Sequence, residues 1–367
     1  MNRRPTQSRT DYDAFSRRHT ARFTAATPDS HFFDPKKKHS LGQKFFFLLF
    51  VLFLFVLSGN FLANRFVFVK KVQIPIRGLS AEHDGYTLLH ISDLKGASFG
   101  KKQDLLTFAL GKAEYDAVVM TGDMISSHGN AQPFYALIEA LSSHQNNVPI
   151  YFIAGDNDPP VASESYFSGG SPFAPWVLGA QQRGAILLNA PQPLTDEEET
   201  IWLMPSTILN LDIDTMQRQY EQQYLRALSS RDDNAIELAT FNLKGLEDTR
   251  SARATMKADD PIITLTHVPP QADETWLADT HLVLGGHYLG GMMRLPLIGP
   301  IFVPAQYLPR YGLFPGANRF SSLQKSSNAW IYANSGLGTS AGEYPSFFFR
   351  LFNPPSVTLI TLTPSAL

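Results

Sequence analysis

The chain has 367 residues, with 25 Gly, 25 Pro and no Cys, and its formal net charge is −2. The absence of Cys excludes disulfides, thiolate zinc sites, iron–sulfur clusters and cysteine nucleophiles. The charge is unevenly distributed, because residues 1–44 carry ten Lys and Arg against four Asp, which leaves a net charge of −8 for the remainder.

The first 44 residues form a basic tail with a net charge of +6. Their sequence is polar and irregular, with scattered Arg, Ser and Thr, and it predicts a disordered segment. Because the body that follows is acidic, the charge profile excludes a nucleic-acid-binding role for the body.

Residues 45–64, between Lys44 and Arg65, carry no charge. Residues 45–57 are an uninterrupted run of Phe, Leu and Val. Twenty helical residues span ~30 Å, which is the thickness of the hydrocarbon core of a bilayer. We therefore predict one transmembrane helix over 45–64. A buried core helix and a cleaved signal peptide are the alternatives, and the long tail and the absence of a clear small-x-small site argue against cleavage.

The orientation of this helix follows from its flanking charges. The basic tail favours a cytoplasmic N-terminus, which would place the body outside the cytoplasm. Arg65, Lys70, Lys71 and Arg77 on the other side weaken the asymmetry close to the membrane. The expectation is a single-pass membrane protein with its N-terminus inside.

After about Val72 the sequence reads as a globular body in which strands alternate with helices. The predicted strands are Thr87–Ile91, Ala117–Met120, Ile150–Ala154, Ala185–Leu188, Ile262–Thr266, Leu282–Leu284, Trp330–Ala333 and Val357–Leu362. Predicted helices are Asp104–Ala113, Pro133–Leu141 and Thr215–Leu228. This alternation predicts an α/β fold. Residues 206–260, which are polar and contain one amphipathic helix, read as a lid or insertion.

Polar residues follow the ends of five predicted strands. They are Asp93, then Gly122-Asp123, then Gly155-Asp156-Asn157-Asp158, then His267, and finally Gly286-His287. Ligands of α/β proteins bind beyond the carboxyl ends of strands, and Gly allows the backbone to turn sharply there. Carboxylate and imidazole groups gathered in this way suit a divalent cation.

The order of these motifs resembles the calcineurin-like metallophosphoesterase superfamily, and most closely its membrane-anchored branch of small bacterial phosphoesterases. The resemblance covers about residues 72–363, and segments 96–100, 290–296 and 335–340 support it. It implies a four-layer sandwich of two mixed β-sheets flanked by helices. It also implies two metal ions at the strand ends, bridged by the carboxylate of the Gly-Asp motif.

The motifs depart from the pattern that the resemblance implies. The first motif of the family is Asp-x-His and the last is Gly-His-x-His, whereas this chain has Lys95 and Leu289 at the final position of each. Lys and Leu offer no lone pair to a metal. By resemblance, the first metal site has lost two of its four ligands. All four positions of the second metal site still offer ligands, and these are Asp123, Asp156 in place of Asn, His267 and His287.

We therefore predict one divalent metal ion, such as Mn, Zn or Fe, at Asp123, Asp156, His267 and His287. Lys95, paired with Asp93, is predicted to supply part of the missing positive charge, unless it is an ordinary exposed lysine. Asn157 stands where the family has a His that contacts phosphate, and it cannot serve as a general acid. Asp158 is expected to keep an orienting role.

Two functions fit these residues. The first is a membrane-anchored metal-dependent phosphoesterase with an altered site, which by resemblance acts on a phosphorylated lipid or cell-envelope substrate. The second is a pseudoenzyme that binds a phosphate-bearing ligand or an envelope partner without turnover. Both predict metal binding, and turnover distinguishes them. Neither the substrate nor the oligomeric state follows from the sequence.

Overall fold

The computed structural model describes residues 40–125, 129–162, 173–195, 200–209, 211–271, 274–295, 298–303, 313–315, 323–326, 329–339 and 350–365. Residues 1–39 of the predicted tail lie outside the described residues. The chain divides into two compact units, residues 1–56 and 57–367.

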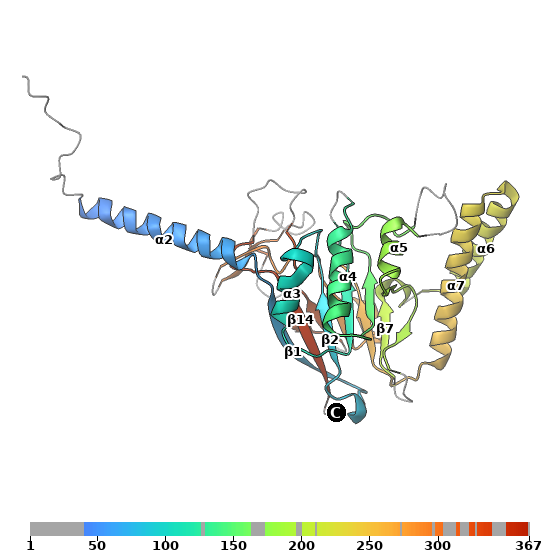
Figure 1. Cartoon of the computed structure of the whole chain (residues 1–367). Coiled ribbons are helices and arrows are strands. Elements are labelled where there is room, and N and C mark those ends of the chain that lie inside the picture. Colours follow the sequence, from blue (N-terminus) through green and yellow to red (C-terminus); the bar gives the residue numbers. More distant parts are fainter. Residues whose placement is uncertain are drawn as a thin grey trace, which may run out of the picture. The chain divides into compact units, whose positions relative to one another are not determined.

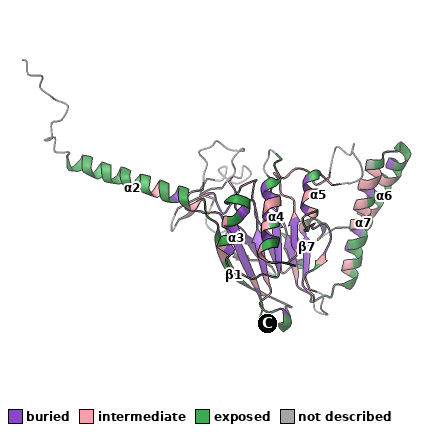
Figure 2. Cartoon of the chain, in the orientation of Figure 1, coloured by how far each residue is buried: buried purple, intermediate pink, exposed green. Residues whose placement is uncertain are grey.

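Helix α2 (Leu41–Ala63) contains almost all of the predicted transmembrane segment. Its Phe side chains and all its Leu side chains except Leu57 are exposed, and among the described residues it is the one helix long and apolar enough to span a bilayer (Figure 2). Near its end, the Asn60 Nδ2 donates to the carbonyl of Arg350 at 2.7 Å, and the Asn60 Oδ1 accepts from the amide of Phe352 at 2.9 Å. These bonds connect the last turn of the helix to segment 350–352.

Two six-stranded sheets form the body. The first has the order β1 (Phe68–Ile76), β14 (Ser356–Pro364), β2 (Thr87–Ile91), β3 (Ala117–Thr121), β4 (Ile150–Ile153), β5 (Ala185–Leu187). Neighbouring strands are parallel except for β14 and β2, which are antiparallel, so the sheet is mixed. Strands β2, β3 and β4 therefore end at the same edge.

The second sheet has the order β12 (Leu323–Lys325), β13 (Trp330–Ala333), β9 (Leu282–Gly285), β8 (Ile262–Leu265), β7 (Trp202–Pro205), β6 (Gln192–Pro193). Its four central strands are parallel, and β12 and β6 are antiparallel edge strands. Strands β10 (Met293–Leu295) and β11 (Gly299–Phe302) form a separate ribbon.

Helices α3 (Asp104–Leu110), α4 (Gln132–His144) and α5 (Pro175–Gln181) cover the outer face of the first sheet (Figure 1). Short 3-10 turns lie at Ala81–His83 (η1), Lys101–Gln103 (η2), Ser206–Ile208 (η3) and Thr275–Asp279 (η4). Helices α6 (Ile213–Ser230) and α7 (Asp233–Thr255) form a hairpin. Asp212 and Asp232 begin these two helices by accepting the amide hydrogens of Thr215 and Ala235.

Successive side chains of a strand point to opposite faces of the sheet, and the buried side chains of the first sheet therefore belong to two separate clusters. Leu89 of β2 and Val118 of β3 belong to the cluster that the helices α3, α4 and α5 complete. Their neighbours Leu88 and Val119 belong to the cluster between the two sheets. Because strands β2 and β3 are buried on both faces, they read as continuous apolar runs.

The structure confirms the predicted α/β fold with two mixed sheets flanked by helices, and all eight predicted strands are present. The sequence did not predict strands β1, β6, β7, β10, β11 and β12. The expectation of one helix within 206–260 was wrong, because α7 is a second one. The apolar residues of α7 are spread around the helix, so the 3.6-residue periodicity that reveals α6 is weak there.

Candidate metal centre

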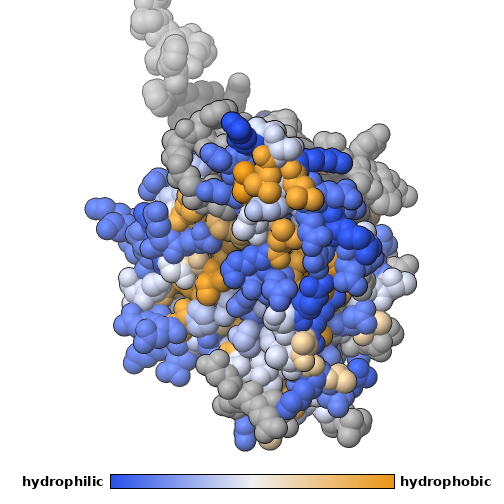
Figure 3. All heavy atoms as spheres, turned by 90° about the vertical axis from the view of Figure 1, so that its right-hand side faces the viewer, coloured by the Kyte–Doolittle hydropathy of each residue, from blue (hydrophilic) through white to orange (hydrophobic). Residues whose placement is uncertain are grey.

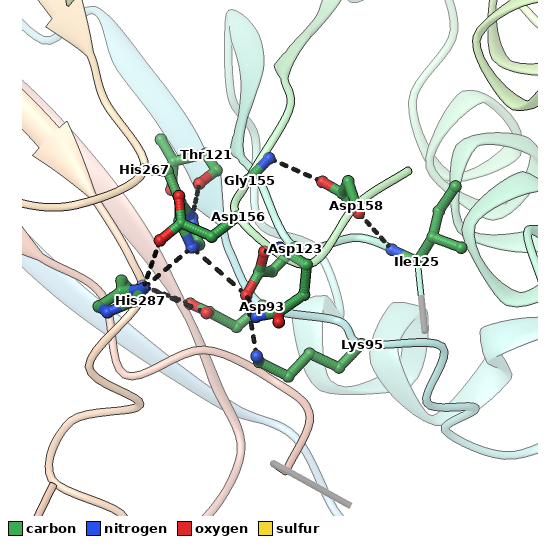
Figure 4. Close-up of polar contacts among 11 residues, drawn as sticks. Asp93, Lys95, Thr121, Asp123, Ile125, Gly155, Asp156, Asp158, His267 and His287 are labelled. Carbon is green, nitrogen blue, oxygen red and sulfur yellow. Dashed lines mark hydrogen bonds and ion pairs between the residues drawn. The ribbon is translucent and has the colours of Figure 1, made fainter. Parts of the chain in front are cut away.

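The loops that follow strands β2, β3, β4, β8 and β9 meet at the edge where these strands end (Figure 4). Two glycines allow the approach. A Cβ on Gly122 would lie 2.6 Å from the backbone of Gly155, and a Cβ on Gly155 would collide with Asp123. The backbone of the second motif thus lies directly against that of the third, which brings Asp123 beside the Asp156 loop.

Several site residues have left-handed backbone conformations. The φ angles are 51° for Asp93, 48° for Lys95, 56° for Asp123, 66° for His287 and 50° for Leu289. Such angles are uncommon outside Gly and tend to cluster at functional sites. Lys95 and Leu289 share them, so the two positions that lack the expected ligand side chain still adopt the strained turns of the site.

His267 and His287 direct one ring nitrogen each toward a common point. The Nδ1 of His267 lies 2.8 Å from the carbonyl oxygen of Thr121, which can only accept, so this nitrogen donates. The Nε2 of His267 is then directed into the site, 3.2 Å from the Nδ1 of His287. A backbone carbonyl that holds the second nitrogen in this way is typical of metal-binding histidines.

Two carboxylates complete this group. The Asp123 Oδ2 lies 3.3 Å from the Nε2 of His267, and the Asp156 Oδ2 lies 3.5 Å from the Nδ1 of His287. Asp123 is buried, whereas 59% of the Asp156 side chain is exposed. The structure therefore groups Asp156, His267 and His287, and Asp123 contacts this group through His267.

Three contacts among these atoms have spacings close to those of neighbouring ligands on a metal ion. Two ligand atoms about 2.1 Å from a metal are about 3.0 Å apart at 90° and about 3.4 Å apart at the tetrahedral angle. The three observed separations, 3.2, 3.3 and 3.5 Å, are close to this interval. Nitrogen and carboxylate oxygen ligands suit Zn, Mn and Fe, and they do not select among them.

Lys95 pairs with a different carboxylate from the one expected. Its Nζ lies 2.8 Å from the Asp123 Oδ2, and the two side chains are 10% and 1% exposed. The predicted pairing with Asp93 was therefore wrong, as was the alternative of an ordinary exposed lysine. Lys95 follows Asp93 by two residues, and the turn between them directs its side chain toward the loop after β3. The ammonium thus contacts the carboxylate that, by resemblance, would bridge two metals.

The Asp93 carboxylate instead accepts the backbone amide of His287, at 3.2 Å for Oδ1 and 3.1 Å for Oδ2. Asp93, Asp123 and His267 make a second group of close ligand atoms. This group shares His267 with the group of Asp156, His267 and His287, so the two groups of described residues are not independent. Leu289, at the remaining position, is fully buried.

Asn157 binds Asp123 through two hydrogen bonds. Its backbone N donates to the Asp123 Oδ1 and its Nδ2 donates to the Oδ2, both at 2.8 Å. The Asp123 carboxylate thus contacts the Lys95 ammonium and the His267 ring, and it accepts both hydrogen bonds from Asn157. This arrangement fixes the carboxylate, and it gives Asn157 a positioning role that the sequence did not predict.

Asp158 orients the loop around the site. Its two oxygens accept the backbone amides of Ile125 and Gly155, both at 2.8 Å. Burial raises the pKa of Asp158 to about 6, although the two amide donors oppose this. The carboxylate therefore connects the second and third motif loops.

The charges of the site act on one another. Burial acts to raise the pKa of Asp123, but the hydrogen bond and charge of His267, together with Lys95, hold it well below its usual range. Burial acts to lower the pKa of His267, but the hydrogen bond to Asp123 and the charges of Asp93 and Asp123 raise it to about 9. Burial and the charge of His267 lower the pKa of His287. A proton on His267 therefore competes with a metal ion.

Sequence reasoning missed the groups that act through their backbone. The carbonyl of Thr121 fixes His267, and the amide of Gly338 binds the carbonyl of Asp93 at 2.6 Å. A Cβ on Gly338 would also lie 2.5 Å from the carbonyl oxygen of Leu94. The Gly residues of segment 335–338 were visible in the sequence, but a backbone group leaves no side-chain signal.

The chain is similar to several known proteins. The sequence pattern of the calcineurin-like phosphoesterase family matches residues 86–290, which include every motif from Asp93 to His287. The uncharacterized metallophosphoesterase YkuE of Bacillus subtilis (strain 168) is 23% identical over 283 residues, which cover 76% of this chain and 79% of that protein. Among solved structures, TT1561 of Thermus thermophilus is similar with a TM-score of 0.35 and 12% identity, covering 70% of this chain and 92% of that one.

Proposed function

Because the chain belongs to the calcineurin-like phosphoesterase family, we propose that it is a membrane-anchored, metal-dependent phosphoesterase that uses one metal ion. The observation that carries this proposal is the ion pair between Lys95 and Asp123, beside a set of ligand atoms with metal-like spacing. One cation of the family pattern is then an ammonium of the chain itself, and the other is the metal.

Asp123, Asp156, His267 and His287 would hold the ion. When bound there, a divalent ion supplies a Lewis acid for a phosphate oxygen and lowers the pKa of a water molecule. Lys95 adds a fixed positive charge beside Asp123, where it can donate to a second phosphate oxygen. Charge-assisted hydrogen bonds of this kind are among the stronger contacts to phosphate.

At the position of Asn157, the site has no side chain that can donate a proton to the leaving group. Asn157 donates hydrogen bonds to Asp123 and cannot give up a proton near neutral pH. We therefore expect esters with acidic leaving groups, such as nitrophenyl esters, to be hydrolysed much faster than alkyl esters. A phosphorylated lipid or envelope substrate remains the proposed natural class.

The test is turnover by the full chain in detergent, with Mn, Zn or Fe supplied in turn and nitrophenyl phosphomono- and diesters as substrates. The Asp123→Asn variant is the control for the metal centre. A loss of activity of about a hundredfold or more in that variant would support hydrolysis at this site. Equal rates for the two proteins would mean that the activity arises elsewhere.

A binding role without turnover is the second candidate, and the position of Asn157 favours it. A side chain that fixes Asp123 and offers no acid fits a site that holds a phosphate group without cleaving it. Phosphate binding with no turnover above the Asp123→Asn control would favour this candidate over the enzyme.

The orientation proposed for the membrane segment has a direct test, because the chain contains no Cys. Single cysteines can be placed at Thr6 in the tail and at Ala258, which is exposed in the body. A membrane-impermeant maleimide added to intact cells should label Ala258→Cys and not Thr6→Cys. The reverse pattern would place the body in the cytoplasm.

A further inference from the structure

A cavity of about 460 Å³ adjoins the metal centre. Asp156 and His267, two of the metal-centre residues, line one end of it. The side chains of Leu187, Leu265 and Phe241 contribute to the remaining wall, which is mostly apolar. Its volume lies within the roughly 300–1,000 Å³ of small-molecule sites. The cavity and the metal centre therefore share residues, so one ligand can occupy both.

The chemistry of the lining restricts that ligand. Of the described residues that line the cavity, Asp156 and His267 alone can ionise, and both belong to the metal centre. Away from them, no described lining residue offers a charge to a second phosphate, a carboxylate or an ammonium group. An apolar wall gains free energy only when it removes apolar surface of the ligand from water. The far part of the cavity therefore suits a hydrocarbon group.

The α6–α7 hairpin contributes Phe241 to this wall. The ring of Phe241 packs edge-to-face on Phe173 at 4.6 Å between centroids. Arg253, on the same helix α7, donates to the carbonyls of Ile208 and Leu209 at 2.5 and 3.0 Å and so ties the hairpin to η3. Figure 3, which looks onto the side where α6 and α7 lie, shows hydrophilic residues over most of this face, with smaller apolar areas between them. The outer face of the hairpin is thus mostly hydrophilic, whereas Phe241 lines the cavity.

We propose that this cavity is the subsite for the apolar group of a phosphate ester or anhydride whose phosphate lies at the metal centre. The proposal rests on the proposed function for the position of the phosphate. It deepens that function by giving the substrate class, an amphiphilic phosphate compound, and by assigning the apolar group to the wall built from β5, β8 and α7.

The test is a binding measurement, so that it does not depend on turnover. The Mn-loaded full chain in detergent is titrated calorimetrically with inorganic phosphate and with ethyl, butyl, hexyl and octyl phosphate. Each methylene that is fully buried should raise the affinity about fourfold, or roughly 200-fold from ethyl to hexyl phosphate. An affinity that does not change with chain length would overturn the proposal.

Two variants, one in η3 and one in α6, distinguish the cavity from other apolar surfaces. Thr207, an exposed residue of η3, lies in the cavity wall, and Thr207→Trp should fill the space and flatten the chain-length dependence. Leu225 of α6 is 62% exposed and does not line the cavity, so Leu225→Ala is the matched control and should keep the dependence. A steep dependence that survives Thr207→Trp would assign the alkyl group to detergent or another surface and would refute the subsite.

The same titrations, run beside the nitrophenyl ester assay, separate the two proposals. A steep chain-length dependence without turnover would support the subsite and contradict the hydrolase. Turnover with no dependence on chain length would support the hydrolase and contradict the subsite.

Discussion

Replacing Lys95 with Met tests the part of the site that differs most from the family pattern. Lys95→Met keeps the length and apolar stem of the side chain but removes the ammonium that contacts Asp123 at 2.8 Å. In the metal-free chain, the Asp123 carboxylate would then lose its closest lysine partner while remaining 1% exposed. A buried charge that loses its partner is strongly destabilising.

The magnitude follows from the distance. At 2.8 Å and an effective dielectric constant of about 20, the direct attraction is about 6 kcal/mol. The desolvation of both groups offsets part of it, and removal of one partner of a buried pair costs about 3–5 kcal/mol. Because Lys95 is 10% exposed, we expect the lower end, about 3 kcal/mol. With an unfolding entropy of about 2.1 cal/mol/K per residue, this corresponds to a fall of roughly 5 °C in the melting temperature of the metal-free chain.

Metal binding should reverse much of this loss, because a divalent ion at the site neutralises Asp123 in place of the ammonium. The assay is the apparent melting temperature of the full chain, after chelation and after reloading with Mn. The rise on reloading should be larger for Lys95→Met than for wild type. Lys101→Met, at an exposed position of η2, is the control and should change neither value. Equal melting temperatures for metal-free wild type and Lys95→Met would refute the reasoning.

Three further predictions concern the surroundings of the site. The pKa of His267 is about 9, so its ring carries a proton at pH 7 that must leave before a metal binds. Metal affinity should therefore rise about tenfold from about pH 7 to about pH 8, and calorimetry should show about one proton released per ion. An affinity that does not change with pH would contradict this. Asp158→Asn leaves the amide of Ile125 or Gly155 without its acceptor and should cost about 1–3 kcal/mol in denaturant unfolding, whereas an unchanged midpoint would remove its orienting role. Asn60→Leu breaks the two bonds to segment 350–352, and a loss of about 1–2 kcal/mol is expected; proteolysis of this segment at an unchanged rate would contradict the connection.

Much of the site was predictable because its residues follow strands that are buried on both faces. Continuous apolar runs ending in Gly-Asp or Gly-His make both the strand and its polar end visible in the sequence, as at Asp123 and His287. Parallel strands with their ends at one edge then bring these residues together. The approach of Asp123, Asp156 and His287 to His267 follows from the fold class once the strands are known.

The partners within the site were not predictable in the same way. Lys95 lies near Asp93 in the sequence, and proximity along the chain favoured that pairing. The left-handed turn at both residues directs the lysine to Asp123 and leaves the Asp93 carboxylate to the amide of His287. Backbone turns of this kind depend on contacts between distant loops, such as the bond from Gly338 to Asp93.

The residues of the cavity wall also could not be predicted from the sequence. Phe241 lies on α7, whose weak periodicity concealed the helix itself. Its contact with Phe173 and its place in the same wall as Leu265 come from tertiary packing of α7. No local pattern at Phe241 indicates that it lines a cavity beside the metal centre.

The number of metal ions per chain tests the central claim most directly. The wild-type full chain, loaded with Mn or Zn and freed of excess metal, should contain one ion per chain by elemental analysis. The variant with Lys95→His and Leu289→His restores the ligands of the family pattern at two positions that already have left-handed backbones, which His tolerates better than Leu. It should contain two ions per chain. Two ions in the wild-type chain would contradict the account.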